Sequence, residues 1–525
     1  MSILTKNKFF YKNLFYLIII LFFSFFINFY YANIGVFPID SFLHYDSANR
    51  IINNEYPVKD FWVVSGISVD FLQAFFFKIF GTNWFSYIIH SSLMNCLIGV
   101  LAYNFFRDLK ISETKSLIYT ICFATLAYTI SGTPFVDLHA SFFLLINTFL
   151  IVKFISNPKK IYLLHLAVLT FFLSFFSKQV PSTYALILYG PILIFYLIKN
   201  KNFEPIKIIL FSTTTLSILF YLILLGLQID FKLFIDEYIN YPRLIGSNRL
   251  NLLDLSFISF FNKFKFIILP IFLICILKLR SFYLKKNFIF EEFKKFLIII
   301  SYSICLVIHQ LLTKNQIFIY FLIPILFALI EIELSFIKKK HVNLITTTLL
   351  INLLIVTFKY HLRFNENRKF HELAKTDLNI SEDAEILDRS LAGLKWINPF
   401  FDGDPLEEIA ILKKGINELN KKKNEIILFT NYLFIDSLTI KKMHYPSRAI
   451  TSDGTTFPLK ENKYFNKYQT FLKNIIFTKK INEVYFFKHE NLPLNLFTNY
   501  FSSECYISKN DLESVFLKFE IKCLE

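Results

Sequence analysis

Long apolar runs constrain this chain more than any other feature of its sequence. Eleven segments are apolar over about the length that a helix needs to cross a bilayer, which is roughly 20 residues. They cover 13–33, 84–106, 116–131, 135–155, 161–176, 181–198, 206–228, 264–278, 296–312, 317–336 and 342–359. We therefore predict a polytopic α-helical membrane protein with about 11 transmembrane helices.

Composition excludes the main alternatives to a membrane protein. Hydrophobic residues supply 54% of the 525 positions and charged residues only 18%, whereas a soluble domain carries roughly 25% charged residues. The chain has 12 glycines, which excludes a collagen-like protein, and its apolar content excludes a disordered one. A soluble or disulfide-rich secreted protein is excluded on the same numbers.

Basic residues determine the predicted orientation. The net charge of +16 would indicate a nucleic-acid partner in a soluble protein. Here 21 Lys and Arg occupy 61 residues of one set of alternate loops, and only 8 occupy 93 residues of the other set. Because basic loops stay in the cytoplasm, we predict a cytoplasmic N-terminus, an outward-facing loop at 35–83 and no nucleic-acid partner.

The chain is predicted to have two domains. Residues 1–359 hold the transmembrane helices, and an odd number of crossings places residues 360–525 outside the cytoplasm. Within this second part, apolar periodicity predicts a helix at 405–421 and a strand at 425–431, and a second such pair at 465–488. Two pairs of a helix and a buried strand indicate a small extracytoplasmic α/β domain.

The outer loop 35–83 is unusually long and acidic for this chain. Apolar residues at helical spacing predict an amphipathic helix from Ser41 to Asn53, and a second helix with a stripe from Val69 to Ile79 that ends at Gly81. We expect both to be amphipathic surface helices on the outer leaflet. They would leave a slot between protein and lipid.

Two aspartates near the predicted outer surface are candidates for chemistry. Asp40 follows the first apolar segment and precedes a helix, so a helix N-cap is the simpler interpretation of that residue alone. Asp137 opens the fourth segment after a three-residue loop. Ionisable groups near membrane depth cost free energy and are functional candidates by default, so Asp137 shifts the balance towards catalysis.

Three cations lie in predicted outer loops. Lys178 falls between two apolar segments, where it either extends to the water at the interface or faces a lipid phosphate. Arg243 and Arg249, in the loop 229–262, are either solvated charges or alternatives for the same role. Taken singly, each cation is better explained as an interfacial or solvated charge. Together with the acids, the three cations indicate an anionic, lipid-linked substrate.

No residue spacing indicates a resident metal or a nucleotide. The histidines lack the spacing of a zinc site, and Asp402-Gly-Asp404 is better explained as a turn that caps a helix beginning at Pro405. The sequence has no Gly-rich phosphate loop, nucleophile elbow or dinucleotide motif. Only Cys505 and Cys523 of the six cysteines lie in polar sequence, where a disulfide between them stays open.

The outer loop also carries an ordered motif. An acid ends the first apolar segment, a short helix contains an arginine, a proline and Asp-Phe follow, and an amphipathic segment ends in Phe-Gly. The residues are Asp40, Arg50, Glu55, Pro57, Asp60, Phe61, Phe80 and Gly81. This order resembles the first outer loop of the GT-C glycosyltransferases, polyprenyl-phosphate-sugar-dependent enzymes that include protein O-mannosyltransferases and aminoarabinose transferases of lipid A. The likeness extends more loosely to about residue 336.

The loop departs from the family pattern in three places. Ser41 follows Asp40 where family members often carry Glu or Gly, and Asn54 stands where Gly is usual. The segment 63–68 also lacks the Pro pair that is common there. Loss of the second acid weakens the case for a divalent cation bound by the loop, although such a cofactor stays open. The motif carries no information on the sugar.

The resemblance implies a hexosyl- or pentosyltransferase that moves a sugar from a polyprenyl-phosphate donor to a lipid, polysaccharide or protein acceptor. Asp40 is expected to act as general base in an inverting displacement, while Asp60 or Asp137 orients the acceptor or assists. Substrate contacts are expected from Asp46, Arg50, Lys178, Arg243 and Arg249. The likeness is closest to bacterial members, which implies a bacterial inner membrane and contact with its lipids.

Two other functions stay open. A lipid-linked glycan transporter or flippase, or a polymerase-like membrane protein, would lack this loop chemistry. Transporters often show inverted repeats and helices broken at mid-membrane, and the sequence shows neither. A non-catalytic membrane scaffold would bind partners through residues 360–525 and would not need the acids of the loop.

Overall fold

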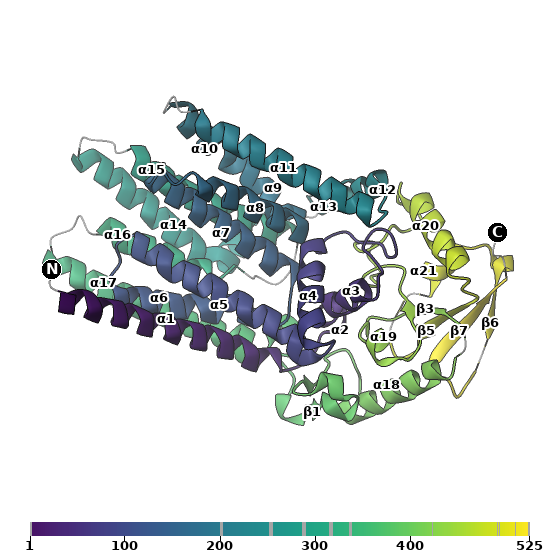
Figure 1. The fold of residues 1–525 in the computed structure, drawn as a ribbon. Coiled ribbons are helices and arrows are strands. Elements are labelled where there is room, and N and C mark those ends of the chain that lie inside the picture. Colours follow the sequence, from purple (N-terminus) through teal and green to yellow (C-terminus); the bar gives the residue numbers. More distant parts are fainter. Residues whose placement is uncertain are drawn as a thin grey trace. The chain divides into compact units, whose positions relative to one another are not determined.

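The computed structural model of the chain is 69% helical, with a small sheet towards the C-terminus (Figure 1). The residues it describes are 3–199, 203–250, 256–285, 290–313, 319–334, 339–422, 424–490, 492, 494–509 and 511–522. Cys523 lies outside these residues, so its pairing with Cys505 stays a prediction.

Two compact units make up the structure, and each is built from three stretches of chain. Unit 1 comprises Met1–Ala32, Ser91–Leu219 and Arg249–Phe370, and unit 2 comprises Asn33–His90, Phe220–Asn248 and His371–Glu525. The predicted boundary at residue 359 separates transmembrane residues from extracytoplasmic residues. The two compact units are defined by packing, which does not test on which side of a membrane a residue lies, so that boundary stays a prediction.

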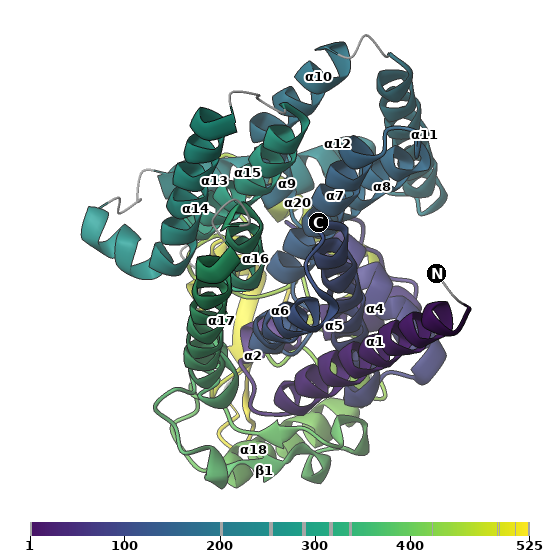
Figure 2. The same cartoon turned by 90° about the vertical axis from the view of Figure 1, so that its left-hand side faces the viewer.

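Helices form unit 1, and Figure 2 gives a second view of them. They are α1 (Ile3–Ala32), α5 (Trp84–Asp108), α6 (Glu113–Leu126), α7 (Val136–Ser156), α8 (Tyr162–Ser177), α9 (Gln179–Leu188), α10 (Gly190–Lys199), α11 (Glu204–Gly226), α14 (Phe257–Lys285), α15 (Phe290–Thr313), α16 (Leu322–Leu334) and α17 (Lys339–His361). The first residues of α5 and the last of α11 belong to unit 2. Within unit 1, α7 packs along α8 and α14 packs along α16.

Eight helical stretches of the described residues are long and apolar enough to cross a membrane. They are Tyr11–Ala32, Trp84–Asp108, Val136–Ser156, Gln179–Lys199, Glu204–Gly226, Phe257–Arg280, Phe293–Thr313 and Val342–Glu366. The other three predicted segments fall on α6, α8 and α16, which have 14, 16 and 13 residues. At 1.5 Å per residue they span about 20–24 Å, less than a hydrocarbon core of roughly 30 Å. The predicted count of eleven is not confirmed.

Several of these helices expose apolar side chains. The α11 stretch has a mean hydropathy of 2.3, yet only 11% of it is buried within the protein, and Leu210, Phe211 and Ile218 are exposed. Water disfavours so large an apolar surface, so α11 is suited to an apolar surrounding. In contrast, protein encloses 83% of the α7 stretch.

Unit 2 contains the five-stranded sheet. Its order is β4 (Met443–His444), β3 (Ile426–Phe429), β5 (Glu483–Phe487), β7 (Phe516–Ile521) and β6 (Tyr506–Lys509), with β3 parallel to β4 and β5 and with β7 antiparallel to β5 and β6. Helices α18 (Pro405–Asn420) and α20 (Phe465–Thr478) precede β3 and β5 in the chain. Both predicted helix–strand pairs are therefore confirmed.

Shorter elements complete unit 2. They are α2 (Pro38–Ser41), α3 (Leu43–Ile52), α4 (Ile67–Phe80), α12 (Phe231–Ile235), a π-helical turn at Asp236–Asn240, α13 (Tyr241–Leu250), β1 (Glu382–Asp383), β2 (Lys395–Trp396), α19 (Ile435–Leu438) and α21 (Asn495–Thr498). The last two residues of α13, Arg249 and Leu250, belong to unit 1. Asp404 accepts a hydrogen bond from the Leu406 backbone N–H at 2.7 Å and caps α18, which confirms the predicted turn.

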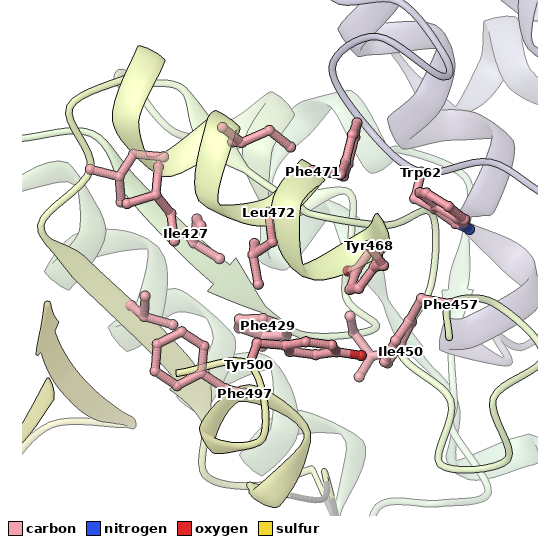
Figure 3. Packing of buried hydrophobic residues seen from close by; sticks show 14 of the residues in the cluster. Trp62, Ile427, Phe429, Ile450, Phe457, Tyr468, Phe471, Leu472, Phe497 and Tyr500 are labelled. Atoms are coloured by element: carbon pink, nitrogen blue, oxygen red, sulfur yellow. The ribbon is translucent and has the colours of Figure 1, made fainter. Parts of the chain in front are cut away.

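An apolar core joins the outer loop to the C-terminal sheet within unit 2. Trp62 of the loop is fully buried, and its ring centroid lies 5.3 Å from that of Tyr468 and 5.7 Å from that of Phe471 on α20 (Figure 3). The Trp62 backbone N–H donates to the Pro446 carbonyl at 3.2 Å. The loop is thus an integral part of the same folding unit as the sheet.

Both predicted loop helices are present, but the burial of α3 differs from the prediction. Every residue of α3 from His44 to Ile51 is buried, so the expectation that its polar face meets water is wrong, because protein groups of unit 2 pair with its charges. In α4 the predicted apolar stripe is only partly enclosed by the protein: Val69 is buried, whereas Phe75 is 58% and Ile79 55% exposed. The opposite face of α4 is buried and carries polar residues.

Candidate functional site

Asp40 is the third residue of helix α2. Phe37 holds the N-cap position of that helix, so the interpretation of Asp40 as the N-cap is wrong. The backbone N–H of Asp40 donates to the Phe37 carbonyl at 2.9 Å, and the residue is half-buried. A partly exposed carboxyl at this position keeps the access to solvent that a proton acceptor needs.

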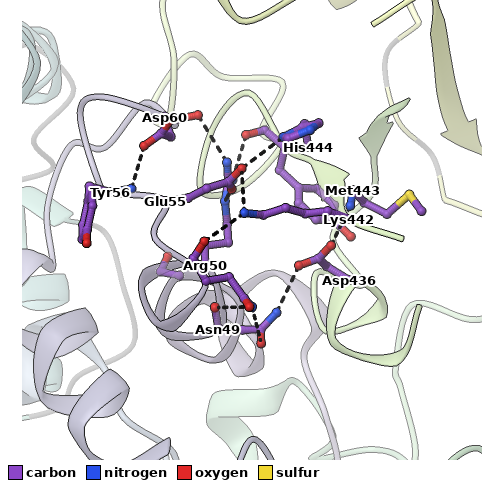
Figure 4. Close-up of polar contacts among 12 residues, drawn as sticks. Asn49, Arg50, Glu55, Tyr56, Asp60, Asp436, Lys442, Met443 and His444 are labelled. Atoms are coloured by element: carbon purple, nitrogen blue, oxygen red, sulfur yellow. Dashed lines mark hydrogen bonds and ion pairs between the residues drawn. The ribbon is translucent and has the colours of Figure 1, made fainter. Parts of the chain in front are cut away.

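Arg50 is 1% exposed, and each of its three nitrogens donates to the protein. Nε donates to Glu55 Oε2 at 2.9 Å, Nη1 to the Tyr445 carbonyl at 2.9 Å and Nη2 to the Asp60 carbonyl at 3.2 Å (Figure 4). The guanidinium carbon lies 4.1 Å from the centroid of the Phe61 ring. We call these five residues the Arg50 hub. Their contacts favour a structural role for Arg50, and its predicted substrate contact stays a prediction.

Glu55 gathers cations from the C-terminal part of unit 2. Lys442 Nζ and His444 Nδ1 each lie 3.2 Å from Glu55 Oε1, and Lys479 Nζ lies 3.7 Å from it. Burial by itself raises the pKa of Glu55, but Arg50 and His444 outweigh burial and hold that pKa below its usual value. The Glu55 carboxylate therefore stays ionised and ties the loop to strand β4.

Asp60 closes the turn that follows Glu55. Its Oδ2 accepts a hydrogen bond from the Tyr56 backbone N–H at 2.9 Å, and Lys479 Nζ lies 4.0 Å from its Oδ1. The residue is half-buried, so part of its surface stays open to solvent. The contacts explain the place of Asp60 in the motif by turn formation, and its predicted catalytic role stays a prediction.

Asp46 lies inside unit 2, one turn before Arg50 on α3. It is 1% exposed, and among the described residues neither carboxylate oxygen has a hydrogen-bond partner. Burial raises the pKa of Asp46 well above its usual value, and the nearby Arg50 charge only partly opposes this rise. Because the carboxyl of Asp46 is enclosed by protein, a structural role is favoured for it. The substrate contact predicted for Asp46 stays a prediction.

A second buried ion cluster in unit 2 was not predicted from the sequence. Arg448 donates to Asp70 Oδ2, to the Ser65 carbonyl and, at 3.2 Å, to Ser47 Oγ. His44 Nδ1 lies 2.6 Å from the other oxygen of Asp70. Asp70 offered a signal, because it interrupts the apolar pattern of its helix. Arg448 offered none, because it lies 378 residues away in the chain.

In unit 1, Asp137 forms a buried ion cluster with two helices that follow it. Lys178 Nζ donates to both carboxylate oxygens, at 2.8 and 2.9 Å. His309 Nε2 lies 2.5 Å from Oδ1. We call these residues the Asp137 triad. It joins the start of α7, the junction of α8 and α9 and the last turns of α15, and it brings together two predicted site residues.

The two predicted arginines lie on α13. Arg243 is exposed, and Arg249 is half-buried. Arg249 is close enough to His309 for its charge to act on the imidazole, which places it near the Asp137 triad. Neither arginine has an ion-pair partner in the part of the chain that the structure describes, and both substrate contacts stay predictions.

The described residues do not fit a resident metal ion. They include no group of three or more His, Cys, Asp and Glu side chains arranged to hold one. The divalent cation that the sequence leaves open therefore has no ligand set of this kind among the described residues.

No protein family matches the chain, and no curated protein matches it significantly. The resemblance of its outer loop to the GT-C glycosyltransferases therefore depends on the loop residues alone.

Proposed function

We propose that this chain is a membrane glycosyltransferase that moves a sugar from a polyprenyl-phosphate donor to an acceptor hydroxyl on the extracytoplasmic face. Asp40 carries the proposal, because it is a partly exposed acid that does not cap its helix. Four of the other motif residues of the loop belong to the Arg50 hub. Helices able to cross a membrane support a lipid-linked substrate, whose isoprenoid tail needs an apolar surrounding.

In the proposed reaction, Asp40 takes the proton of the acceptor hydroxyl as that oxygen attacks the anomeric carbon. The bond between the anomeric carbon and the phosphate oxygen breaks, and its electron pair leaves with polyprenyl phosphate. Lys178 offsets the charge that develops on this phosphate, which is usually a large catalytic contribution. Asp60 or Asp137 orients the acceptor, and the single displacement inverts the anomeric centre.

The proposal also includes the finer topology. The chain would cross the bacterial inner membrane about 11 times, with its N-terminus in the cytoplasm and its C-terminal domain outside. The charge bias of the alternate loops supports this orientation. Lipid, polysaccharide and protein remain the candidate acceptors.

Mass spectrometry of cell-envelope glycans tests the proposal. A deletion strain is complemented with wild type, Asp40→Asn or Asp402→Asn, the last being a matched control at an exposed acid. We expect Asp40→Asn to lower transfer by about 10²–10⁴-fold and to shorten one glycan by a single sugar, while Asp402→Asn matches wild type. If Asp40→Asn restores the glycan as wild type does, the transporter or scaffold function replaces the transferase.

A further inference from the structure

The Asp137 triad contains a buried hydrogen-bonding atom that the protein does not use. His309 is fully buried, and in the described residues its Nδ1 has no hydrogen-bond partner. Asp137 also accepts from Lys178, so the short contact at its Oδ1 requires a donor and assigns the ring proton to Nε2. A neutral ring then presents the lone pair of Nδ1.

This unused acceptor is costly without a ligand. Burying a polar group that lacks a partner destabilises the folded protein, whereas a purely structural link between α7 and α15 would need only the Nε2 contact. Asp137 fixes the ring orientation in the way that a carboxylate orients a histidine whose other nitrogen contacts a substrate. The geometry is therefore prepared for a hydrogen-bond donor at Nδ1.

The charges around His309 indicate which chemical group a ligand would carry beside its hydrogen-bond donor. Lys178 and Arg249 contribute two positive charges, and Asp137 contributes one negative charge. The excess of one positive charge favours an anion, and both cations are partly exposed. A ligand with a hydroxyl close to a phosphate matches both features.

We propose that His309 Nδ1 accepts a hydrogen bond from a sugar hydroxyl of the polyprenyl-phosphate donor, whose phosphate faces Lys178 and Arg249. This inference rests on the proposed function, since it takes the donor class from there. His309 is a substrate-binding residue, and Asp137 is the positioning residue that orients its ring. The contact contributes to recognition of the sugar and not to binding of the lipid or its phosphate.

His309→Gln separates this role from a structural one. The glutamine amide keeps a donor for Asp137 but removes the Nδ1 acceptor. His165→Gln is the matched control, because His165 is an exposed histidine of unit 1 whose Nδ1 lies 2.6 Å from Ser212 Oγ. Native mass spectrometry of the full chain in nanodiscs measures affinities for polyprenyl-phosphate-glucose, -mannose and -galactose and for polyprenyl phosphate.

We expect wild type to bind at least one sugar-carrying lipid, and His309→Gln to weaken that binding by about tenfold while polyprenyl phosphate binds as before. His165→Gln should change neither affinity. Unchanged affinities in His309→Gln, or an equal loss for lipids with and without sugar, would overturn the inference and leave the proposed function intact. A wild type that binds polyprenyl phosphate and none of the three hexose lipids overturns the inference for a hexosyl donor, and the same measurement with polyprenyl-phosphate-arabinose then decides it for a pentosyl donor.

Nitrogen-15 solid-state NMR of the ligand-free full chain gives a readout that needs no substrate. The His309 ring signals are assigned by their loss in His309→Gln or, should that variant unfold, in His309→Asn. We expect a protonated Nε2 and a bare Nδ1 without a hydrogen bond. An imidazolium ring, a protonated Nδ1 or an Nδ1 already hydrogen-bonded within the protein overturns the inference.

Discussion

The Arg50 hub and the Asp137 triad are both buried clusters of charge, but they differ in how they use their hydrogen-bonding groups. In the hub, every nitrogen of Arg50 donates to a carboxylate or a carbonyl of the protein. In the triad, one nitrogen of His309 has no partner among the described residues. An arginine whose donors are all in use holds a fold together, whereas a histidine with an unused acceptor retains capacity for a ligand.

This difference changes how the loop motif is understood. The order Arg50, Glu55, Asp60 and Phe61, which suggests chemistry in the sequence, is explained by the packing of one arginine. A residue type that recurs in an enzyme motif can therefore hold the loop in shape. Asp40 differs from these residues because it remains half-buried and lies outside the hub.

Removing the centre of the hub should have the largest effect on stability. Arg50→Ala removes three hydrogen bonds and the buried ion pair with Glu55, and breaking a buried ion pair by removing one partner costs about 3–5 kcal/mol. Tryptophan fluorescence during unfolding reports this, because all three tryptophans, Trp62, Trp84 and Trp396, belong to unit 2. The exposed Arg243→Ala is the control and should change stability by less than about 0.5 kcal/mol. A loss below 1 kcal/mol in Arg50→Ala would contradict the closed network.

A smaller effect is expected when the triad loses its cation. Lys178→Met removes two charge-assisted hydrogen bonds from Asp137, while His309 still donates to the carboxylate. We expect the free energy of unfolding to fall by about 1.5–3 kcal/mol. A thiol-reactive dye measures the loss, because the buried cysteines Cys96, Cys122 and Cys305 lie in unit 1. A loss of stability as large as that of Arg50→Ala would show that the triad contributes as much to the stability of the fold as the hub does.

The smallest effect is expected at Asp46 and depends on pH. Because the folded pKa of Asp46 is raised, the unfolded chain gives up this proton first as pH rises above about 4, and stability falls from there. Asp46→Asn removes the ionisation and should stabilise unit 2 by about 1 kcal/mol at pH 8. The gain should vanish by pH 4 in fluorescence-monitored unfolding. A gain that is equal at both pH values would show that Asp46 is not held neutral.

The sequence by itself determined the local structure. Apolar runs specify a helix at each predicted segment, since an apolar side chain seeks the same surrounding wherever its helix packs. Helical periodicity likewise specifies α18 and α20, and short apolar runs specify the buried strands β3 and β5. The length of α6 was missed, because the predicted segment runs to residue 131 on apolar character that continues beyond Leu126, where the helix ends.

Only the tertiary structure decided which polar groups meet. Arg448 reaches Asp70 across 378 positions, and His309 reaches Asp137 across 172, and no local pattern encodes such a pairing. The burial of α3 was also decided there, because an amphipathic helix has the same sequence whether water or an ion-pairing protein surface covers its polar face. The physical reason is that burial and charge pairing are properties of neighbours in space, whereas periodicity reports only neighbours along the chain.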